Sequence, residues 1–188
     1  MFRDLVLKNR SYRRFDANVK VDRDTLLELV DLARQTPSTG NQQPLKYYFS
    51  TDAATNGIIY NHITWAGYLT DWPGPTAEEC PSAYIVILRD NQISRADSPD
   101  VGIVAQTIML AAVEKGLGGC MFASMRKGLR EALGISEQFD IVLVLALGKP
   151  AEQVVLEPVG PTGSIRYHRD AAGVHYVPKR AIEDIVIE

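Results

Sequence analysis

The segment at residues 100–116, DVGIVAQTIMLAAVEKG, places the strongest constraint on how this chain folds. Asp100 is suited to cap the start of a helix, and Gly116 to the left-handed residue that ends one. Apolar residues occupy every side of this predicted helix, whereas a surface helix of a monomer keeps a polar stripe. We therefore expect its own sheet to cover one face and a second subunit to cover the other. A helix wrapped entirely by its own chain is the alternative.

Other segments predict a sheet with helices packed on it. The near-continuous apolar runs at residues 82–89 and 141–148 are typical of strands in the middle of a sheet that is covered on both faces. Residues 45–51, rich in Tyr and Phe, predict a third strand. Helical spacing predicts an amphipathic helix over residues 22–34 and a shorter helix over residues 125–133. With 188 residues, a single α/β domain is the expected organisation.

Composition excludes several classes of protein. The chain is 46% hydrophobic and 23% charged, which is typical of a globular domain and disfavours disorder. A net charge of -3 provides no general attraction to nucleic acid, so no nucleic-acid partner is expected. The N-terminus does not resemble a signal peptide, and the apolar stretch at residues 101–113 is too short to span a bilayer, so no membrane association is expected. Cys80 and Cys120 lack metal-ligand spacing and are expected to be reduced thiols of a cytoplasmic protein.

The C-terminal third predicts loops, a hairpin and a tail. Pro and Gly concentrate at residues 72–81 and 150–163, which predicts loops. Residues 165–169 and 174–177 flank a turn and predict a hairpin. The final segment, residues 181–188, alternates apolar and polar residues, and such a tail is expected to pair with a sheet edge, including that of another subunit.

Basic residues gather at both ends of the chain. Seven of the 20 Lys and Arg residues lie in the first 23 positions, with Arg10, Arg13 and Arg14 around Ser11. Guanidinium groups beside a hydroxyl can hold a phosphate through charge-assisted hydrogen bonds. The pair Lys179-Arg180 would strengthen such a site if the two ends met. A solvated basic surface is the alternative.

Two further segments are candidates for ligand contact. Residues 37–44, PSTGNQQP, form a dense array of hydrogen-bonding groups suited to a ligand with carbonyls and ring nitrogens, or else a plain helix-to-strand turn. The glycine-rich residues 115–120 follow a predicted helix, so they form neither a dinucleotide fingerprint nor a phosphate loop. They suit close approach to a flat ligand, with the amides of residues 121–125 free to bind it, or a simple helix stop.

Sequence motifs of side-chain catalysis are absent. The chain has no GxSxG, HExxH or Walker sequence and no concentrated carboxylate pair. Its three histidines, His62, His168 and His175, have no evident partners. A protein with phosphate-binding and ring-facing groups but no catalytic side chains is expected to take its reactivity from a cofactor.

Taken in order, these segments resemble the nitroreductase family of FMN-dependent oxidoreductases. The matching blocks are RSYRRF at residues 10–15, the Pro-Ser and Asn-Gln-Gln-Pro residues within 37–44, the helix and Gly-Leu-Gly of 100–118, and Lys179-Arg180. The resemblance implies an α+β fold with a mixed central sheet flanked by helices. It also implies one domain over residues 1–188, in an intertwined homodimer in which residues 165–188 reach onto the partner.

The resemblance also implies which residues bind FMN. Arg10, Ser11 and Arg13 would hold the phosphate, the ribityl chain and the pyrimidine edge, with Tyr12 in the same motif and Lys179 and Arg180 on the phosphate. Pro37, Ser38, Thr39 and Asn41 would approach the flavin from the other subunit, and Ala123, Ser124 and Met125 would face its N5 side. Two departures from the family pattern are Asn9, where an arginine is common, and Leu45, where an aromatic is common.

The implied activity is a ping-pong transfer of hydride from NAD(P)H through flavin N5 to an electron-poor small molecule such as a nitroaromatic, a quinone or an enone. Arg13 would give electrostatic support to the reduced flavin. Trp65 or Tyr68 would line the acceptor pocket, and residues 72–79 would shape it. A non-catalytic module that binds a phosphorylated ligand, and a flavin-dependent dehalogenase-like enzyme, are the alternatives.

Overall fold

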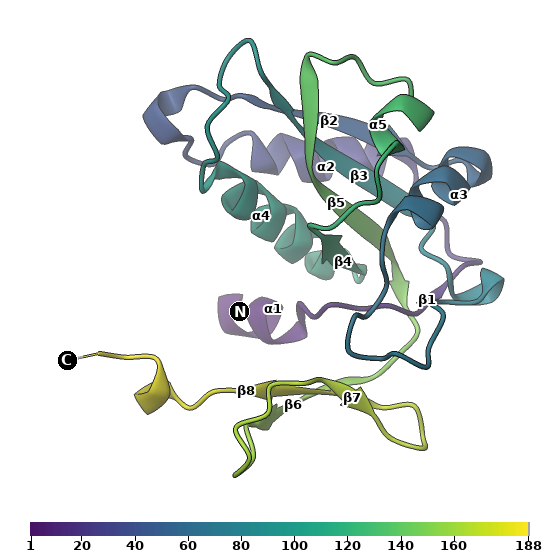
Figure 1. Cartoon of the computed structure of the whole chain (residues 1–188), viewed down its shortest axis with the longest axis vertical. Coiled ribbons are helices and arrows are strands. Elements are labelled where there is room, and N and C mark those ends of the chain that lie inside the picture. Colours follow the sequence, from purple (N-terminus) through teal and green to yellow (C-terminus); the bar gives the residue numbers. More distant parts are fainter. Residues whose placement is uncertain (188) are drawn as a thin grey trace.

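A five-stranded sheet forms the centre of the computed structural model, which describes residues 1–187 (Figure 1). The strands lie in the order β1-β5-β3-β2. The fifth strand, β4, pairs with residues 144–148 of β5, next to the residues of β5 that pair with β1. Their bounds are β1 (Phe15–Asp16), β2 (Leu45–Ser50), β3 (Ala83–Asp90), β4 (Gly118–Phe122) and β5 (Phe139–Pro150). All these pairs are antiparallel, and Ser11 adds a parallel bridge to Gly119. The α+β class is confirmed, and the parallel pairing lies at this bridge and in a second, smaller sheet.

Helices cover both faces of the large sheet, as the apolar runs predicted. α2 (Arg23–Ala33) and α4 (Asp100–Glu114) pack on one face, and α3 (Ala53–His62) and α5 (Leu129–Ala132) on the other. Side chains of a strand point alternately to opposite faces, so β3 supplies both cores. Its residues divide between the α2/α4 core (Ala83, Ile85, Ile87) and the α3/α5 core (Tyr84, Val86, Leu88).

α4 matches the predicted helix in extent, but this chain covers only part of it. Gly116 follows it with φ of +71°, the left-handed conformation expected. Ile103 stays 36% exposed, and Gln106 is exposed too. The prediction that Asp100 caps the helix is wrong: Pro99 is the N-cap, and Asp100 is buried in the first turn, where it binds the loop after α2.

Three other predictions need correction. The helix expected over residues 125–133 shortens to α5, because Gly128 adopts φ of +94° directly before it. Residues 118–122, expected to be a glycine-rich stop followed by loop backbone, form β4 and pair with β5. The loop expected over residues 150–163 contains β6 (Val154–Pro158), whose pairing partner lies far along the chain. Sequence patterns also did not predict the short helices α1 (Phe2–Lys8) and α3.

The C-terminal part forms the second sheet, in the order β6-β8-β7. The predicted hairpin is present, with β7 (His168–Arg169) antiparallel to β8 (His175–Lys179), while β6 pairs in parallel with β8. Beyond it the tail runs away from the body (Figure 1), with a short 3-10 turn at Ile182–Asp184. Residues 181–187 contain no strand, so the expected sheet-edge pairing is not made within this chain; Glu188 lies outside the described residues. None of the described helices combines the length and apolarity needed to cross a membrane.

Candidate functional site

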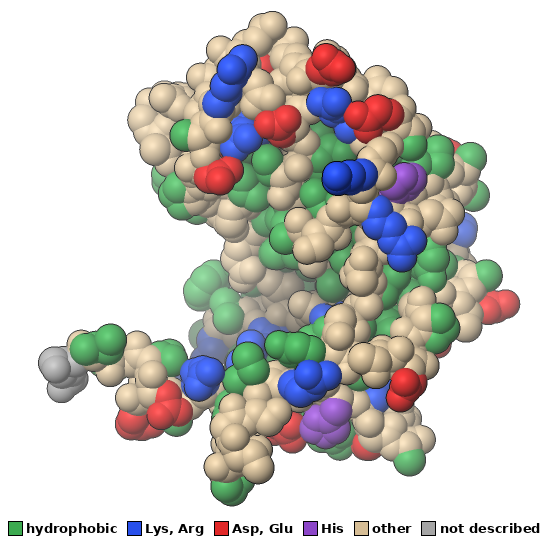
Figure 2. Space-filling view, in the orientation of Figure 1, with side chains coloured by type: hydrophobic (Ala, Val, Ile, Leu, Met, Phe, Trp, Pro, Cys, Tyr) green, Lys and Arg blue, Asp and Glu red, His purple; other side chains and the backbone are tan. Residues whose placement is uncertain are grey.

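A cavity of about 350 Å³ lies between the main body and the C-terminal sheet. Figure 2 shows a hollow on this face, with Lys and Arg side chains gathered inside it. Four parts of the chain line the cavity: the segment RSYRRF at residues 10–15 (the N-terminal motif) with Asn9 before it, α4, β4, and the second sheet β6-β8-β7 (the C-terminal sheet) with its connections. The lining residues are Asn9, Arg10, Ser11, Arg13, Gln106, Met109, Gly119, Met121, Val154, Tyr167, Val177 and Lys179.

The lining carries positive charge without compensation. Arg10, Arg13 and Lys179 all face this cavity, and none of its lining residues is acidic. Lys179 has no ion-pair partner within the described part of the chain. Cations from the two ends of the chain therefore line one cavity. A cavity lined in this way attracts an anion.

Arg10 has spare hydrogen-bonding capacity. Its Nη2 donates to the carbonyl of Val6 at 2.7 Å, while its Nε is buried and has no partner. Burial lowers the pKa of the Arg10 guanidinium from its ordinary value, but arginine remains charged. A buried donor without an acceptor is costly, so an anionic oxygen at this position would be stabilising.

β4 holds the N-terminal motif in place. The Tyr12 N–H donates to the carbonyl of Gly119 at 2.9 Å, next to the Ser11 bridge. A Cβ on Gly119 would lie 2.1 Å from the carbonyl oxygen of Ala146, so only glycine allows β4 to approach β5 this closely. This glycine therefore serves strand packing as well as lining the cavity.

Arg13 lies among aromatic rings of the C-terminal sheet. Its guanidinium carbon is 4.6 Å from the centre of the Tyr167 ring, and its Nη1 is 3.2 Å from Nε2 of His175. His175 is fully buried, and burial, together with the charges of Arg13 and Arg169, lowers its pKa to about 4. His175 is therefore neutral near pH 7, and its Nε2 accepts a hydrogen bond from Arg13.

The neutral state of His175 makes stability depend on pH. An unfolded histidine titrates near pH 6.5, so the unfolded chain binds a proton between pH 6.5 and 4 that the folded chain does not. We expect the contribution of His175 to the free energy of unfolding to be at its maximum above pH 6.5. This free energy should then fall by roughly 3 kcal/mol as the pH drops to 4. Urea unfolding at several pH values measures this, and His175→Gln should reduce the slope in that window. The exposed His168, replaced in the same way, is the control; an unchanged slope in His175→Gln would contradict the assignment.

The polar loop at residues 37–44 lies elsewhere in this chain. Asp100 accepts hydrogen bonds from the Ser38 hydroxyl at 2.6 Å and from the Thr39 N–H at 2.9 Å. Burial opposes ionisation of Asp100, but bonds from Ser38, Ser98 and Thr39 outweigh it and hold its pKa below the usual value. Pro37 and Ser38 line a separate cavity of about 210 Å³, and Asn41 is exposed. Within one chain this loop does not contribute to the cationic cavity.

Other predicted site residues also lie outside the cationic cavity. Ala123 and Ser124 are exposed beyond the end of β4, and Met125 forms a bridge with Ile63. The Tyr12 hydroxyl donates to the carbonyl of Lys8, and Arg180 is exposed beside Lys179. These five residues remain predictions, since none of them lines the cavity.

The aromatic residues expected near an acceptor have separate positions. Trp65 is buried in the α3/α5 core against Phe122, with ring centres 4.7 Å apart. Tyr68 is 40% exposed and packs with its ring tilted against that of Tyr167, which does line the cavity. Tyr167 and Gln106 were not among the predicted site residues, because no local motif marks either residue and only the packing of distant segments places them in the cavity.

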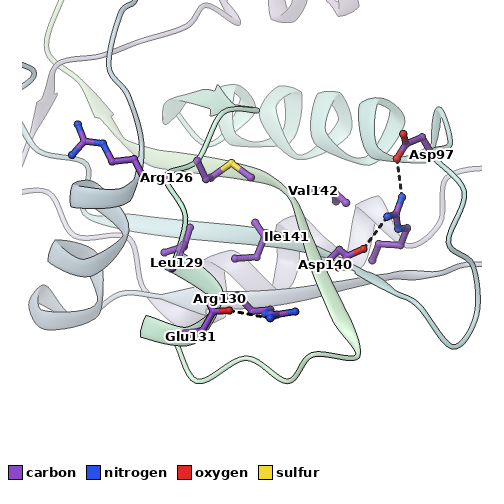
Figure 3. A pocket seen from close by; sticks show the side chains of 11 residues that line it. Asp97, Arg126, Leu129, Arg130, Glu131, Asp140, Ile141 and Val142 are labelled. Carbon is purple, nitrogen blue, oxygen red and sulfur yellow. Dashed lines mark hydrogen bonds and ion pairs between the residues drawn. The ribbon is translucent and has the colours of Figure 1, made fainter.

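A cavity on another part of the surface provides a contrast. It has a volume of about 500 Å³ and lies beside α5 and the start of β5 (Figure 3). Two of its three arginines are paired with carboxylates: Arg89 binds Asp97 at 2.7 Å and Asp140 at 2.9 Å, and Arg130 binds Glu131. The third, Arg126, donates to the carbonyl of Asn61. Carboxylates in its own lining balance its positive charge, whereas the lining of the cationic cavity contains no carboxylate.

Comparison with known proteins identifies relatives of this chain. The model described as the nitroreductase family matches residues 6–149. A Bacillus subtilis (strain 168) protein described as an NAD(P)H nitroreductase, YodC, is 26% identical, with 79% of this chain and 91% of the relative aligned.

Solved structures share the fold. A protein of Desulfovibrio desulfuricans described as a nitroreductase in complex with FMN aligns over 100% of this chain and 95% of its own, with a TM-score of 0.72 and 18% identity. A nitroreductase family protein from Clostridium novyi NT aligns over 80% of this chain and 86% of its own, with a TM-score of 0.65 and 25% identity.

Proposed function

The chain belongs to the nitroreductase family, and from this premise we propose that it is an FMN-dependent oxidoreductase that uses NAD(P)H to reduce an electron-poor small molecule. The observation that carries the proposal is the cationic cavity, in which Arg10, Arg13 and Lys179 meet without a lining carboxylate. The described residues lack a group of three or more His, Cys, Asp and Glu that could hold a metal ion. Membership of the family, together with the cationic hydrogen-bond donors of the cavity, favours a phosphorylated organic cofactor.

The residues of the cavity fit FMN. Arg10 and Lys179 would bind the phosphate, with the unpartnered Nε of Arg10 as one donor. Arg13, held against Tyr167, would place positive charge beside the ring system. Bound FMN would supply hydride transfer between NAD(P)H and the acceptor, in ping-pong order. The protein would orient the cofactor and stabilise the charge that it gains.

The proposal includes a homodimer. Ile103 on α4 and Ile182, Ile185 and Val186 on the tail are exposed apolar residues, and a partner would bury them. A second subunit would also bring its Pro37 to Asn41 loop to the cofactor, since that loop lies outside the cavity within one chain. Two free thiols, Cys80 and Cys120, fit the cytoplasmic location that we include in the proposal.

Absorbance spectroscopy tests the proposed activity. We expect purified protein, reconstituted with FMN and desalted, to retain a flavin band that NADH or NADPH bleaches under anaerobic conditions. A nitroaromatic, a quinone and an enone, added in turn, should identify the acceptors that restore the band. Protein that retains no FMN would contradict the proposal and favour a binding module for another phosphorylated ligand. A bound flavin that neither nicotinamide reduces would contradict the reductase activity alone.

A further inference from the structure

Glu152 is a buried carboxylate at the junction of the N-terminal motif and the C-terminal sheet. It lies just beyond β5 and beyond residues 6–149, and its side chain is only 2% exposed. Its Oε1 accepts hydrogen bonds from the backbone N–H groups of Arg13 and Arg14, the latter at 3.1 Å. Its Oε2 accepts from Nη2 of Arg169 at 2.8 Å. Every one of these partners is a donor in a segment distant in sequence.

Arg169 compensates the charge of Glu152 from the other side. Its side chain is 10% exposed, and its guanidinium carbon lies 4.2 Å from the centre of the Trp72 ring. A carboxylate buried alone would be strongly unfavourable, so this cation allows Glu152 to remain charged at the junction. Arg169 contacts no residue of the N-terminal motif through a hydrogen bond of its own. The direct contact with that motif is therefore made by Glu152.

The two amides held by Glu152 belong to the segment that carries the cavity's cations. One carboxylate oxygen that accepts from two successive N–H groups restricts the backbone between them. On the other side, the Tyr12 N–H is fixed to the carbonyl of Gly119. Residues 10–13 are thus held between β4 and Glu152, with Arg10, Ser11 and Arg13 facing the cavity. Loss of either anchor would loosen the backbone that carries these side chains.

We infer that Glu152 is a positioning residue for the cofactor: its carboxylate, through the Arg13 and Arg14 amides, holds the N-terminal motif so that Arg10 meets the phosphate of FMN. This inference rests on the proposed function. Glu152 does not line the cavity, so it acts only through the motif. The C-terminal sheet, most of which follows the region matched to the family, then contributes to cofactor recognition as well as to the cavity wall.

The ratio of riboflavin to FMN dissociation constants tests this role, because it isolates recognition of the phosphate. Fluorescence titrations of the full-length protein measure both constants, and thermal unfolding monitors stability. Glu152→Ala alone would leave Arg169 buried without a partner, so the informative variant is Glu152→Ala combined with Arg169→Met. Arg169→Lys is the matched variant, because it keeps both the carboxylate and a cation beside it. Asp140→Asn, which removes a partner of Arg89 in the cavity beside α5, is the control for lost stability.

In the Glu152→Ala/Arg169→Met protein we expect the ratio of the riboflavin dissociation constant to the FMN dissociation constant to fall by at least about tenfold. A fall of this size corresponds to the loss of one charge-assisted contact. Arg169→Lys and Asp140→Asn should lower the melting temperature and keep the ratio within about threefold of wild type. A folded double variant with the wild-type ratio would overturn the inference, as would an equal loss in Arg169→Lys. If wild-type protein itself binds no FMN, the proposed function fails instead.

Discussion

Replacing Arg10 and Lys179 together with glutamine is expected to weaken FMN binding by about a thousandfold. Both side chains line the same cavity, and neither has a carboxylate partner there. Each charge-assisted hydrogen bond to a phosphate contributes about 1.5–3 kcal/mol, and two such contacts amount to roughly a thousandfold in affinity. Equilibrium dialysis or quenching of flavin fluorescence measures this loss. Riboflavin, which lacks the phosphate, should bind the variant and the wild-type protein with similar affinity.

A matched pair of basic residues tests whether this effect is specific. Arg126 and Lys127 are exposed neighbours at the cavity beside α5, away from the cationic cavity. Their replacement with glutamine removes the same net charge, and FMN affinity should stay within about threefold. A loss below about tenfold in the folded Arg10→Gln/Lys179→Gln protein would show that these cations do not bind the phosphate.

Placing charge on the C-terminal tail is expected to separate the subunits. Ile185 is 61% exposed and Val186 is 50% exposed, and both belong to the tail that Figure 1 shows running away from the body. Burial of two such side chains in a partner contributes about 4 kcal/mol, so Ile185→Asp/Val186→Asp should raise the dimer dissociation constant by about a thousandfold. Sedimentation velocity over a concentration series measures this constant. FMN affinity should fall in parallel, because the proposed site includes a loop of the partner.

An exposed isoleucine outside the proposed interface provides the control. Ile93 is 43% exposed in the turn after β3, and Ile93→Asp should leave the dissociation constant unchanged. A wild-type protein that sediments as a monomer when saturated with FMN would contradict the dimer proposal. A tail variant that remains fully dimeric would instead remove the tail from the interface.

The sequence determined the elements whose signals are local. Apolar runs predicted β3 and β5 because a strand covered on both faces needs apolar residues at successive positions. Helical spacing likewise predicted α2, which Asp22 caps with its side chain accepting from the Thr25 N–H at 2.8 Å. Each of these signals depends on residues within a few positions of one another. The order of the motifs along the chain also pointed to the family.

Weaker local signals were overridden by tertiary packing. β6 was expected to be a loop, because Pro and Gly surround it, yet it pairs in parallel with β8. Likewise, Gly118 and Gly119 reduce strand propensity, but their small size lets β4 pack closely against β5. In both cases a distant strand supplies the hydrogen bonds that stabilise the segment.

For the candidate site, the sequence alone determined the chemical types: arginines beside a serine near one end, and a basic pair near the other. It could not determine which of these residues share a cavity. Only the tertiary structure placed Arg10 and Lys179 together, held Arg13 against Tyr167, and brought Glu152 to the N-terminal motif. The physical reason is that these contacts join segments far apart in the chain. They form only when the two sheets pack, and no pattern of neighbouring residues specifies them.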